Sequence, residues 1–171
     1  SFECNQFLQD RDSIDLGDGM SLEVLETPGH TRDSLSFYFP KDRLAVVGEA
    51  AGVPVSGLDD IQVEFLSSHD QYLTSIKRLQ GLDIELLGLP HQMYARGCDI
   101  VRAYLQTSVQ STETYIERLK SYFQEADGNA EMVFNRIFDE DYQSGQIGQP
   151  EPAYRLNLQA QVSLIGHELS K

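Results

Sequence analysis

The chain has 171 residues and a formal net charge of −14, and 40% of its residues are hydrophobic. This length and apolar content are enough to bury the core of one domain. The negative charge argues against nucleic-acid binding, because such proteins use clustered Lys and Arg to displace counterions from phosphates. No apolar run reaches the roughly 20 residues that a helix needs to span a bilayer. The composition therefore predicts a soluble, cytoplasmic protein without a nucleic-acid or membrane partner.

The first part of the chain is predicted to form short strands separated by turns. Apolar, β-branched and aromatic residues are grouped there between turns that contain Gly, Pro or Asp. The expected strands are residues 13–16, 21–25, 34–39, 44–47 and 84–87. A helix is expected before the last strand, because apolar residues recur at helical spacing after a capping box of Ser68 and Gln71, and Gly81 supplies the stop. His69, in the first turn of this helix, is expected at the surface. The chain therefore begins as an α/β unit.

The later part of the chain is predicted to be all-helical. Three apolar stripes recur there every three or four residues. The first stripe is Val101, Leu105, Thr112, Ile116, Leu119 and Phe123, the second is Met132, Val133, Ile137 and Phe138, and the third is Leu158, Val162, Ile165 and Leu169. Gly128 and residues 143–149, which are rich in Gly, Gln and Ser, are expected to be loops. We therefore divide the chain into an α/β region, residues 1–97, and a helical region, residues 98–171.

Three side chains that suit a metal ion follow predicted strands. His30 stands in a Pro-Gly turn after the second strand, and such a turn lets an imidazole project from the edge of a sheet. Glu49 follows the strand at 44–47, and His91 follows the strand at 84–87 after a Gly-Leu-Pro turn. Imidazole nitrogens and carboxylate oxygens are good ligands for zinc or iron. We therefore expect His30, Glu49 and His91 to contribute to a metal site.

These motifs resemble those of the metallo-β-lactamase-fold hydrolases. Residues 27–31, Thr-Pro-Gly-His-Thr, match the family's first motif letter for letter. Gly48-Glu49 stands where the family has Gly-Asp, and Leu89-Pro90-His91-Gln92 stands where it has Pro-Gly-His-Gly. The resemblance covers roughly residues 15–100. It implies the C-terminal half of an αββα sandwich, followed by a helical region that packs on the site.

The resemblance also implies roles for the candidate ligands. In the family, the first His completes a three-histidine site, the acidic residue bridges two metals, and the last His binds the second metal. These roles fall on His30, Glu49 and His91, in a zinc or iron centre that is dinuclear in the complete protein. The two metals share a hydroxide that attacks the substrate. Glu49 departs from the family's Asp, because its extra methylene moves the carboxylate by on the order of an ångström.

Three further residues are candidates for supporting roles. Thr31 is expected to hydrogen-bond a metal ligand, or alternatively to cap the turn. Tyr94 and Arg96 follow His91 closely enough to bind an anionic group of the substrate, or alternatively form a solvent-facing pair. Residues 139–141, Asp-Glu-Asp, lack interleaved histidines and are expected to be a solvated acidic surface.

The family's signature His-x-His-x-Asp-His is not found in this sequence. It belongs to the N-terminal half of the fold, so we expect this chain to be a fragment that is inactive without that half, with a natural metal-free truncation as the alternative. The predicted function is a metal-dependent hydrolase of a small-molecule thioester, ester or lactone. The rival is a degenerate, non-catalytic module that binds a small molecule or a protein. A di-iron oxidoreductase with a flavin partner is a third, weaker hypothesis. The sequence leaves open whether the protein forms a homo-oligomer.

Overall fold

The computed structural model describes residues 7–145 and 147–170, in which a six-stranded sheet is central. Its strands are β1 (Ser13–Gly17), β2 (Met20–Glu26), β3 (Leu35–Phe39), β4 (Leu44–Val46), β7 (Leu86–Gly88) and β8 (Tyr94–Arg96), in that order across the sheet. Neighbouring strands are antiparallel except for β4 and β7, which pair in parallel. A separate hairpin of β5 (Val53–Gly57) and β6 (Asp60–Gln62) lies within the connection from β4 to β7.

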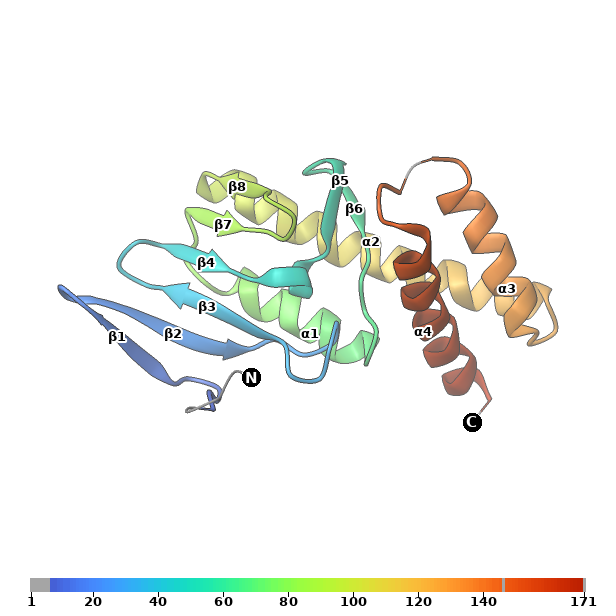
Figure 1. Ribbon diagram of the computed structural model, residues 1–171, viewed down its shortest axis with the longest axis horizontal. Helices are drawn as coiled ribbons and strands as arrows, with labels where there is room; N and C mark the ends of the chain where they lie inside the picture. Colours follow the sequence, from blue (N-terminus) through green and yellow to red (C-terminus); the bar gives the residue numbers. More distant parts are fainter. Residues whose placement is uncertain (1–6, 146, 171) are drawn as a thin grey trace.

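The helices lie on one face of the sheet and beyond its end (Figure 1). They are η1 (Gly48–Ala51), α1 (His69–Gln80), α2 (Cys98–Glu125), α3 (Ala130–Ile137), the π-helical turn η2 (Phe138–Tyr142) and α4 (Glu151–Leu169). Of the helices described, none is both long and apolar enough to cross a membrane. This finding leaves the cytoplasmic location as a prediction from the sequence.

The local patterns of the sequence are confirmed in the α/β region. Each predicted strand overlaps an observed one, and α1 begins after Ser68, whose hydroxyl accepts a hydrogen bond from the Gln71 backbone N–H at 3.2 Å. Gly81 ends the helix. The sequence did not predict β5, β6 and β8, because a proline and the adjoining turns interrupt any alternation of apolar residues over such short segments.

One core lies between the sheet and helices α1 and α2. Its residues are apolar and almost fully buried, and burying each large side chain contributes about 1.5–3 kcal/mol. They include Leu25, Ala45, Leu87 and Ala95 from the sheet, Tyr72, Ile76 and Leu79 from α1, and Val101, Tyr104 and Leu105 from α2. This core fixes α1 against the strand ends that carry the candidate ligands.

The same core continues between the later turns of α2 and helices α3 and α4. This part is formed by Ile116, Leu119, Phe123, Val133, Ile137, Phe138, Tyr154, Leu158, Val162 and Ile165. The predicted stripes are confirmed except at Met132 and Leu169, which are 58% and 47% exposed. Helix α2 runs along the whole core and contacts α1 and the sheet as well as the C-terminal helices. The division at residues 97 and 98 stays a prediction.

The other face of the sheet is apolar and is not covered by any helix that the structure describes (Figure 1). Strand register places Phe37 of β3 beside Val46 of β4, and the same face continues through Gly88 to Tyr94. Val46 is 44% exposed and Tyr94 is 64% exposed, whereas Ala45, which points to the helices, is fully buried. An apolar sheet face of this kind is typical of a surface that packs against another element.

Candidate functional site

The Thr-Pro-Gly-His turn connects β2 to β3 and is bound to the start of α1. The carbonyl of Gly29 accepts hydrogen bonds from the backbone N–H groups of Leu66 and Ser67, each at 3.0 Å. The carbonyl of Pro28 accepts one from the Ser75 hydroxyl at 2.7 Å. Both carbonyl groups of the turn are therefore hydrogen-bonded, and these bonds hold the turn against the start of α1.

Gly29 is the residue at which the turn touches α1 most closely. A Cβ atom added there would lie 2.4 Å from the Cα and N atoms of Tyr72, and the φ of Gly29 is +134°. Both the contact and the backbone conformation exclude a larger residue. The glycine of the motif is therefore required by the packing of the turn on the helix, and this packing sets the direction of His30.

His30 is half-buried, and its ring is oriented by the backbone. Its Nδ1 atom lies 2.6 Å from the carbonyl oxygen of Glu64, so Nδ1 carries a hydrogen and donates a hydrogen bond to that oxygen. The Nε2 atom is then left with its lone pair. A histidine fixed through one nitrogen by a carbonyl is typical of a metal ligand that binds through the other.

The side chains of Glu49 and His91 lie close together, although they belong to two different loops of the sheet. Glu49 lies in η1 after β4, and His91 lies in the turn between β7 and β8. Their Oε1 and Nε2 atoms are 3.9 Å apart. His91 and Gln92 have φ values of +58° and +68°, a region that costs residues other than Gly about 1–2 kcal/mol each. The family's glycine would remove this cost at Gln92.

A cavity of about 410 Å³ contains all three predicted ligands. His30, Glu49 and His91 line it together with Gln62, Glu64 and Asn157 and with residues of β5 and the 148–150 segment. Within residues 7–145 and 147–170, no three His, Cys, Asp or Glu side chains are close enough together to enclose a metal ion. The nitrogen and oxygen donors fit zinc or iron by their chemistry, but these three side chains are not grouped closely enough to hold an ion by themselves.

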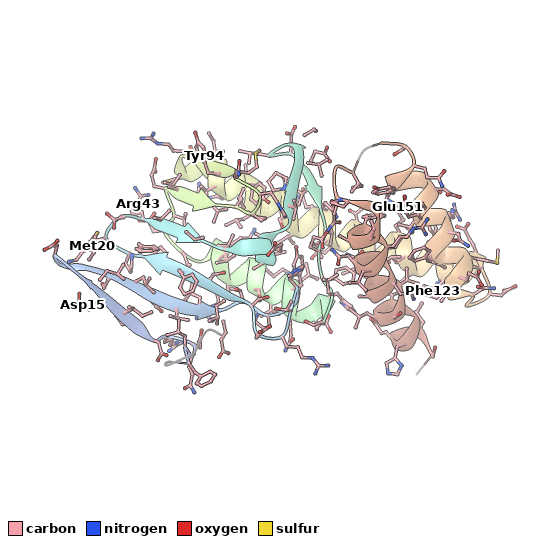
Figure 2. The ribbon with its side chains drawn as sticks, viewed as in Figure 1. Asp15, Met20, Arg43, Tyr94, Phe123 and Glu151 are labelled. Atoms are coloured by element: carbon pink, nitrogen blue, oxygen red, sulfur yellow. The ribbon has the colours of Figure 1, made fainter. Side chains whose placement is uncertain are left out.

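The other predicted site residues lie elsewhere. Thr31 is exposed, and its hydroxyl lies 2.8 Å from that of Ser34 within the same turn. Tyr94 and Arg96 are exposed on the edge strand β8, and neither lines the cavity of His30. Figure 2 shows Tyr94 at the edge of the sheet, away from Glu151 at the start of α4. The structure therefore does not bring Tyr94 or Arg96 to the candidate ligands.

Glu64 is a buried residue of the site that the sequence did not reveal. It is only 3% exposed. Its carboxylate accepts hydrogen bonds from the side-chain amides of Gln62 and of Asn157, the latter at 2.8 Å. The pKa of Glu64 is raised from 4.5 to about 7, chiefly by burial; the charge of Glu49 contributes to this rise, while the two amides oppose it. The site therefore holds a carboxyl group that resists ionisation.

This shift predicts a pH dependence of stability in the metal-free protein. The folded state keeps the Glu64 proton up to about pH 7, whereas the unfolded chain releases it near pH 4.5. The stabilisation is therefore fully present below pH 4.5 and is lost as the pH rises through 7, by about 3 kcal/mol in total. We expect the difference in free energy of unfolding between the wild type and Glu64→Gln to change by this amount between pH 4.5 and 8.

The measurement is urea unfolding of both proteins with a chelator present. The free energy of unfolding of each protein also depends on the titration of all its other groups. Subtracting one protein's value from the other's at each pH removes this common contribution. Parallel stability curves for the two proteins would contradict the assignment of a raised pKa to Glu64.

Tyr72 of α1 connects the segments that carry Glu49 and Glu64. Its side chain is fully buried. The hydroxyl donates to the Glu49 carbonyl at 3.1 Å and accepts from the Glu64 backbone N–H at 3.4 Å. Because the core holds α1 in place, the Tyr72 hydroxyl fixes the positions of the Glu49 and Glu64 segments relative to each other.

His69 shows that a residue in the first turn of a helix need not be at the surface. Its side chain is 14% exposed, and its Nε2 lies 2.6 Å from Glu168 Oε2 of α4. Phe65 packs edge-on against its ring. The expectation of a surface histidine was wrong because α4, which is distant in the sequence, covers the start of α1.

Comparison with known proteins agrees with the fold. The sequence matches the model of the metallo-beta-lactamase superfamily over residues 5–91. A hydroxyacylglutathione hydrolase from Hahella chejuensis is 51% identical over 47 residues, which are 28% of this chain and 14% of that protein. A metallo-beta-lactamase family protein from Thermus thermophilus superimposes with a TM-score of 0.64 at 18% identity, over 95% of this chain and 48% of that one.

A beta-lactamase domain protein from Burkholderia ambifaria gives a TM-score of 0.63 at 16% identity, over 96% of this chain and 47% of that one. The chain thus spans about half the length of these two structures. The family model covers 87 of 171 residues, from 5 to 91. The chain therefore belongs to the metallo-beta-lactamase superfamily.

Proposed function

We propose that this chain supplies one side of the active site of a metal-dependent hydrolase that acts on a thioester, ester or lactone. The observation that carries the proposal is the convergence of His30, Glu49 and His91 on one cavity, with His30 fixed through Nδ1. Membership of the superfamily supports hydrolysis. The similarity to a hydroxyacylglutathione hydrolase favours a thioester among the three substrate classes.

The residues of this chain would bind and orient the reacting groups. Zinc or iron would be held by Nε2 of His30, the carboxylate of Glu49 and the imidazole of His91, in a dinuclear centre. Such a centre lowers the pKa of bound water and polarises the carbonyl of the substrate. Glu49 contributes the negative charge, and the carbonyl of Glu64 keeps His30 in the tautomer that can bind.

We further propose that the remaining ligands come from the N-terminal half of the same fold, which is the partner of this chain. Phe37, Val46 and Tyr94 lie on the apolar sheet face that no described helix covers. A second sheet packed on this face would complete a sandwich and bury these side chains. Homo-oligomerisation stays a prediction from the sequence.

The experiment that tests the proposal is metal analysis of the intact protein, as purified, together with turnover of a thioester, an ester and a lactone. We expect about two zinc or iron ions per molecule and hydrolysis of at least one substrate. A protein with neither metal nor turnover would refute the hydrolase and leave the binding module as the function.

That second candidate, a non-catalytic binding module, is favoured by Glu49. The family has Asp at this position, and a longer side chain displaces a carboxylate in a site whose geometry tolerates only small errors. The carboxylate of Glu49 is close to His91 and 37% exposed, so its contribution can be tested without disturbing the core.

We expect Glu49→Gln to lower turnover at least about 10-fold and to reduce bound metal, because the neutral amide is a weaker ligand than the carboxylate. Glu49→Asp keeps the charge and is expected to retain more metal than Glu49→Gln. The measurements are metal content and kcat/KM of the intact variants. Equal metal content in all three proteins would show that Glu49 does not contact the metal.

A further inference from the structure

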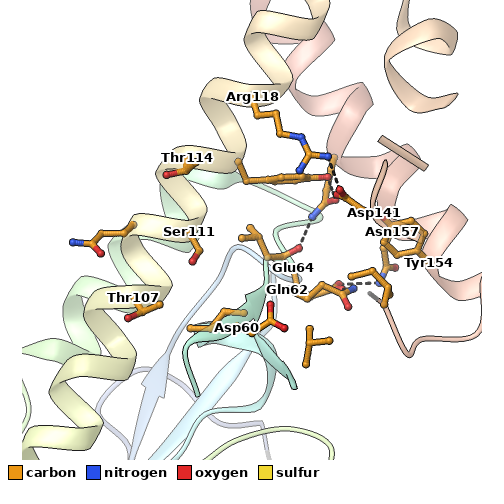
Figure 3. Close-up of a pocket in the computed structure, with 17 residues that line it drawn as sticks. Asp60, Gln62, Glu64, Thr107, Ser111, Thr114, Arg118, Asp141, Tyr154 and Asn157 are labelled. Carbon is orange, nitrogen blue, oxygen red and sulfur yellow. Dashed lines mark hydrogen bonds and ion pairs between the residues drawn. The ribbon is translucent and has the colours of Figure 1, made fainter. Parts of the chain in front are cut away.

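A second cavity, of about 400 Å³, adjoins the cavity of the candidate ligands. It lies between α2, the segment that includes β6 and Glu64, η2 and α4 (Figure 3). Four residues line both cavities, namely Val55, Gln62, Glu64 and Asn157. These four side chains form the common wall of the two cavities, so a molecule that passes them would enter the second cavity.

The part of α2 before Tyr115 gives this cavity a polar and uncharged side. Thr107, Gln110, Ser111 and Thr114 line it, at the spacing of residues that share one helix face. Figure 3 shows Thr107, Ser111 and Thr114 along this helix. In the described part of the chain, none of these four side chains is hydrogen-bonded to another protein group. Their hydroxyl and amide groups are free to bind a ligand.

Arg118 adds a donor that has no acceptor in the described protein. Its Nε atom is buried and has no hydrogen-bond partner, although the residue lines the cavity. Its charge is already balanced, because NH2 lies 2.6 Å from Asp141 Oδ1 and 3.5 Å from Glu140 Oε2. A buried donor without an acceptor is unfavourable, and an acceptor oxygen from a ligand that reaches Nε would remove this cost.

The remaining charges make the cavity unfavourable for anions. Asp60, Glu64 and Asp141 line it, and Arg118 is the single cation among its lining residues. A carboxylate or phosphate group would be repelled by the carboxylates of Asp60 and Asp141. A carbonyl oxygen or a hydroxyl group can accept a hydrogen bond from Arg118 without this electrostatic repulsion. The aromatic rings of Tyr115 and Tyr154 also line the cavity and suit the carbon atoms of such a chain.

We propose that the second cavity binds an uncharged arm of the substrate, a chain with an amide or hydroxyl groups, while the bond to be hydrolysed lies in the cavity of His30. This inference rests on the proposed hydrolase function and adds the chemical class of the substrate's distal part. Carbonyl or hydroxyl oxygens of the arm accept hydrogen bonds from Arg118 and from the α2 side chains. Its N–H or O–H groups donate to Glu64, to Asp60 or to the α2 hydroxyls.

The test compares three butyryl thioesters on the intact protein. One has N-acetylcysteamine as the thiol and therefore a neutral amide arm, one has 2-mercaptoethanesulfonate and an anionic arm, and one has ethanethiol and no arm. We expect kcat/KM for the amide-armed thioester to exceed that of the other two at least 10-fold. A preference for the sulfonate, or equal values for all three, would overturn the proposal.

Variants on α2 assign this preference to the cavity. Ser111→Leu fills the space beside the arm, and we expect the 10-fold preference over the armless thioester to fall to about one. Ser121→Leu is the matched control, because Ser121 is exposed on the same helix and does not line the cavity. Thr107→Val removes one hydroxyl without adding bulk, and it replaces Ser111→Leu if that variant fails to fold. A preference that survives in Ser111→Leu, or in Thr107→Val where that variant replaces it, would overturn the proposal.

A binding measurement separates the proposal from the hydrolase function on which it rests. S-butyl-N-acetylcysteamine is the non-hydrolysable thioether of the amide-armed substrate, and its binding is measured by isothermal titration calorimetry. If no thioester, ester or lactone is hydrolysed, the proposed function fails, and binding that is lost in Ser111→Leu but kept in Ser121→Leu still supports the cavity. Absence of binding to the wild type would overturn the cavity's assignment.

Discussion

Replacing His30 with alanine is expected to abolish both metal binding and hydrolysis in the intact protein. Its Nδ1 donates to the Glu64 carbonyl, and its Nε2 is the free nitrogen in the cavity. Alanine removes that nitrogen, and loss of a ligand that fixes the reactive centre costs on the order of 10³-fold in turnover. The measurements are metal content per molecule and kcat/KM with the thioester that the wild type hydrolyses best.

The matched control is His167→Ala. His167 is exposed near the end of α4 and does not line the cavity, so metal content and turnover are expected to stay as in the wild type. Circular dichroism of both variants would show whether the fold is kept, as the half-buried position of His30 suggests. Turnover that survives in His30→Ala would refute the assignment of His30 as a ligand.

Gly29→Ala is expected to cause the largest loss of stability among single substitutions near the site. The added methyl group would lie 2.4 Å from backbone atoms of Tyr72, which cannot move without displacing α1 from the core. The φ of +134° adds backbone strain. Together these effects cost about 3 kcal/mol or more. The measurement is the midpoint of urea unfolding, which is expected to fall sharply.

Gly17→Ala separates the two causes. Gly17 has a φ of +84°, but no atom lies within 4 Å of the position that its Cβ would take. This variant therefore reports backbone strain alone, about 1–2 kcal/mol. If Gly29→Ala is no more destabilising than Gly17→Ala, the close approach of the turn to α1 is not what requires the glycine.

The parts of the structure that depend on neighbouring residues could be predicted from the sequence. Strand alternation, the Ser68 cap and the turn before His30 are local, and each is confirmed. The cavity shared by His30, Glu49 and His91 follows from their places after three strands of one sheet and from the family motif. The resemblance supplied the roles of these residues, which spacing alone does not give.

The parts that depend on contacts between distant segments could not be predicted. Glu64 is bound by Asn157, which is 93 residues further along the chain, and no local pattern marks either residue. Residues 139–141 were expected to be a solvated acidic surface. The structure instead places Asp141 2.6 Å from Arg118 with a side chain only 19% exposed. The expectation was wrong for Asp141, because its partner Arg118 lies on α2, 23 residues earlier, whereas Asp139 and Glu140 are exposed as expected.

Helix α2 has a mechanical consequence for the two cavities. It is a single helix of 28 residues, about 42 Å long, with neither Gly nor Pro in its sequence. One end of α2 packs beneath the sheet and the other end packs against the C-terminal helices. The helix therefore acts as one rigid rod, and the packing of α4 on its later turns holds α4 in place relative to the sheet. This arrangement favours side-chain motion over rotation of the C-terminal helices as the route into the second cavity. We expect the buried amides along α2 to exchange hydrogen slowly and at similar rates.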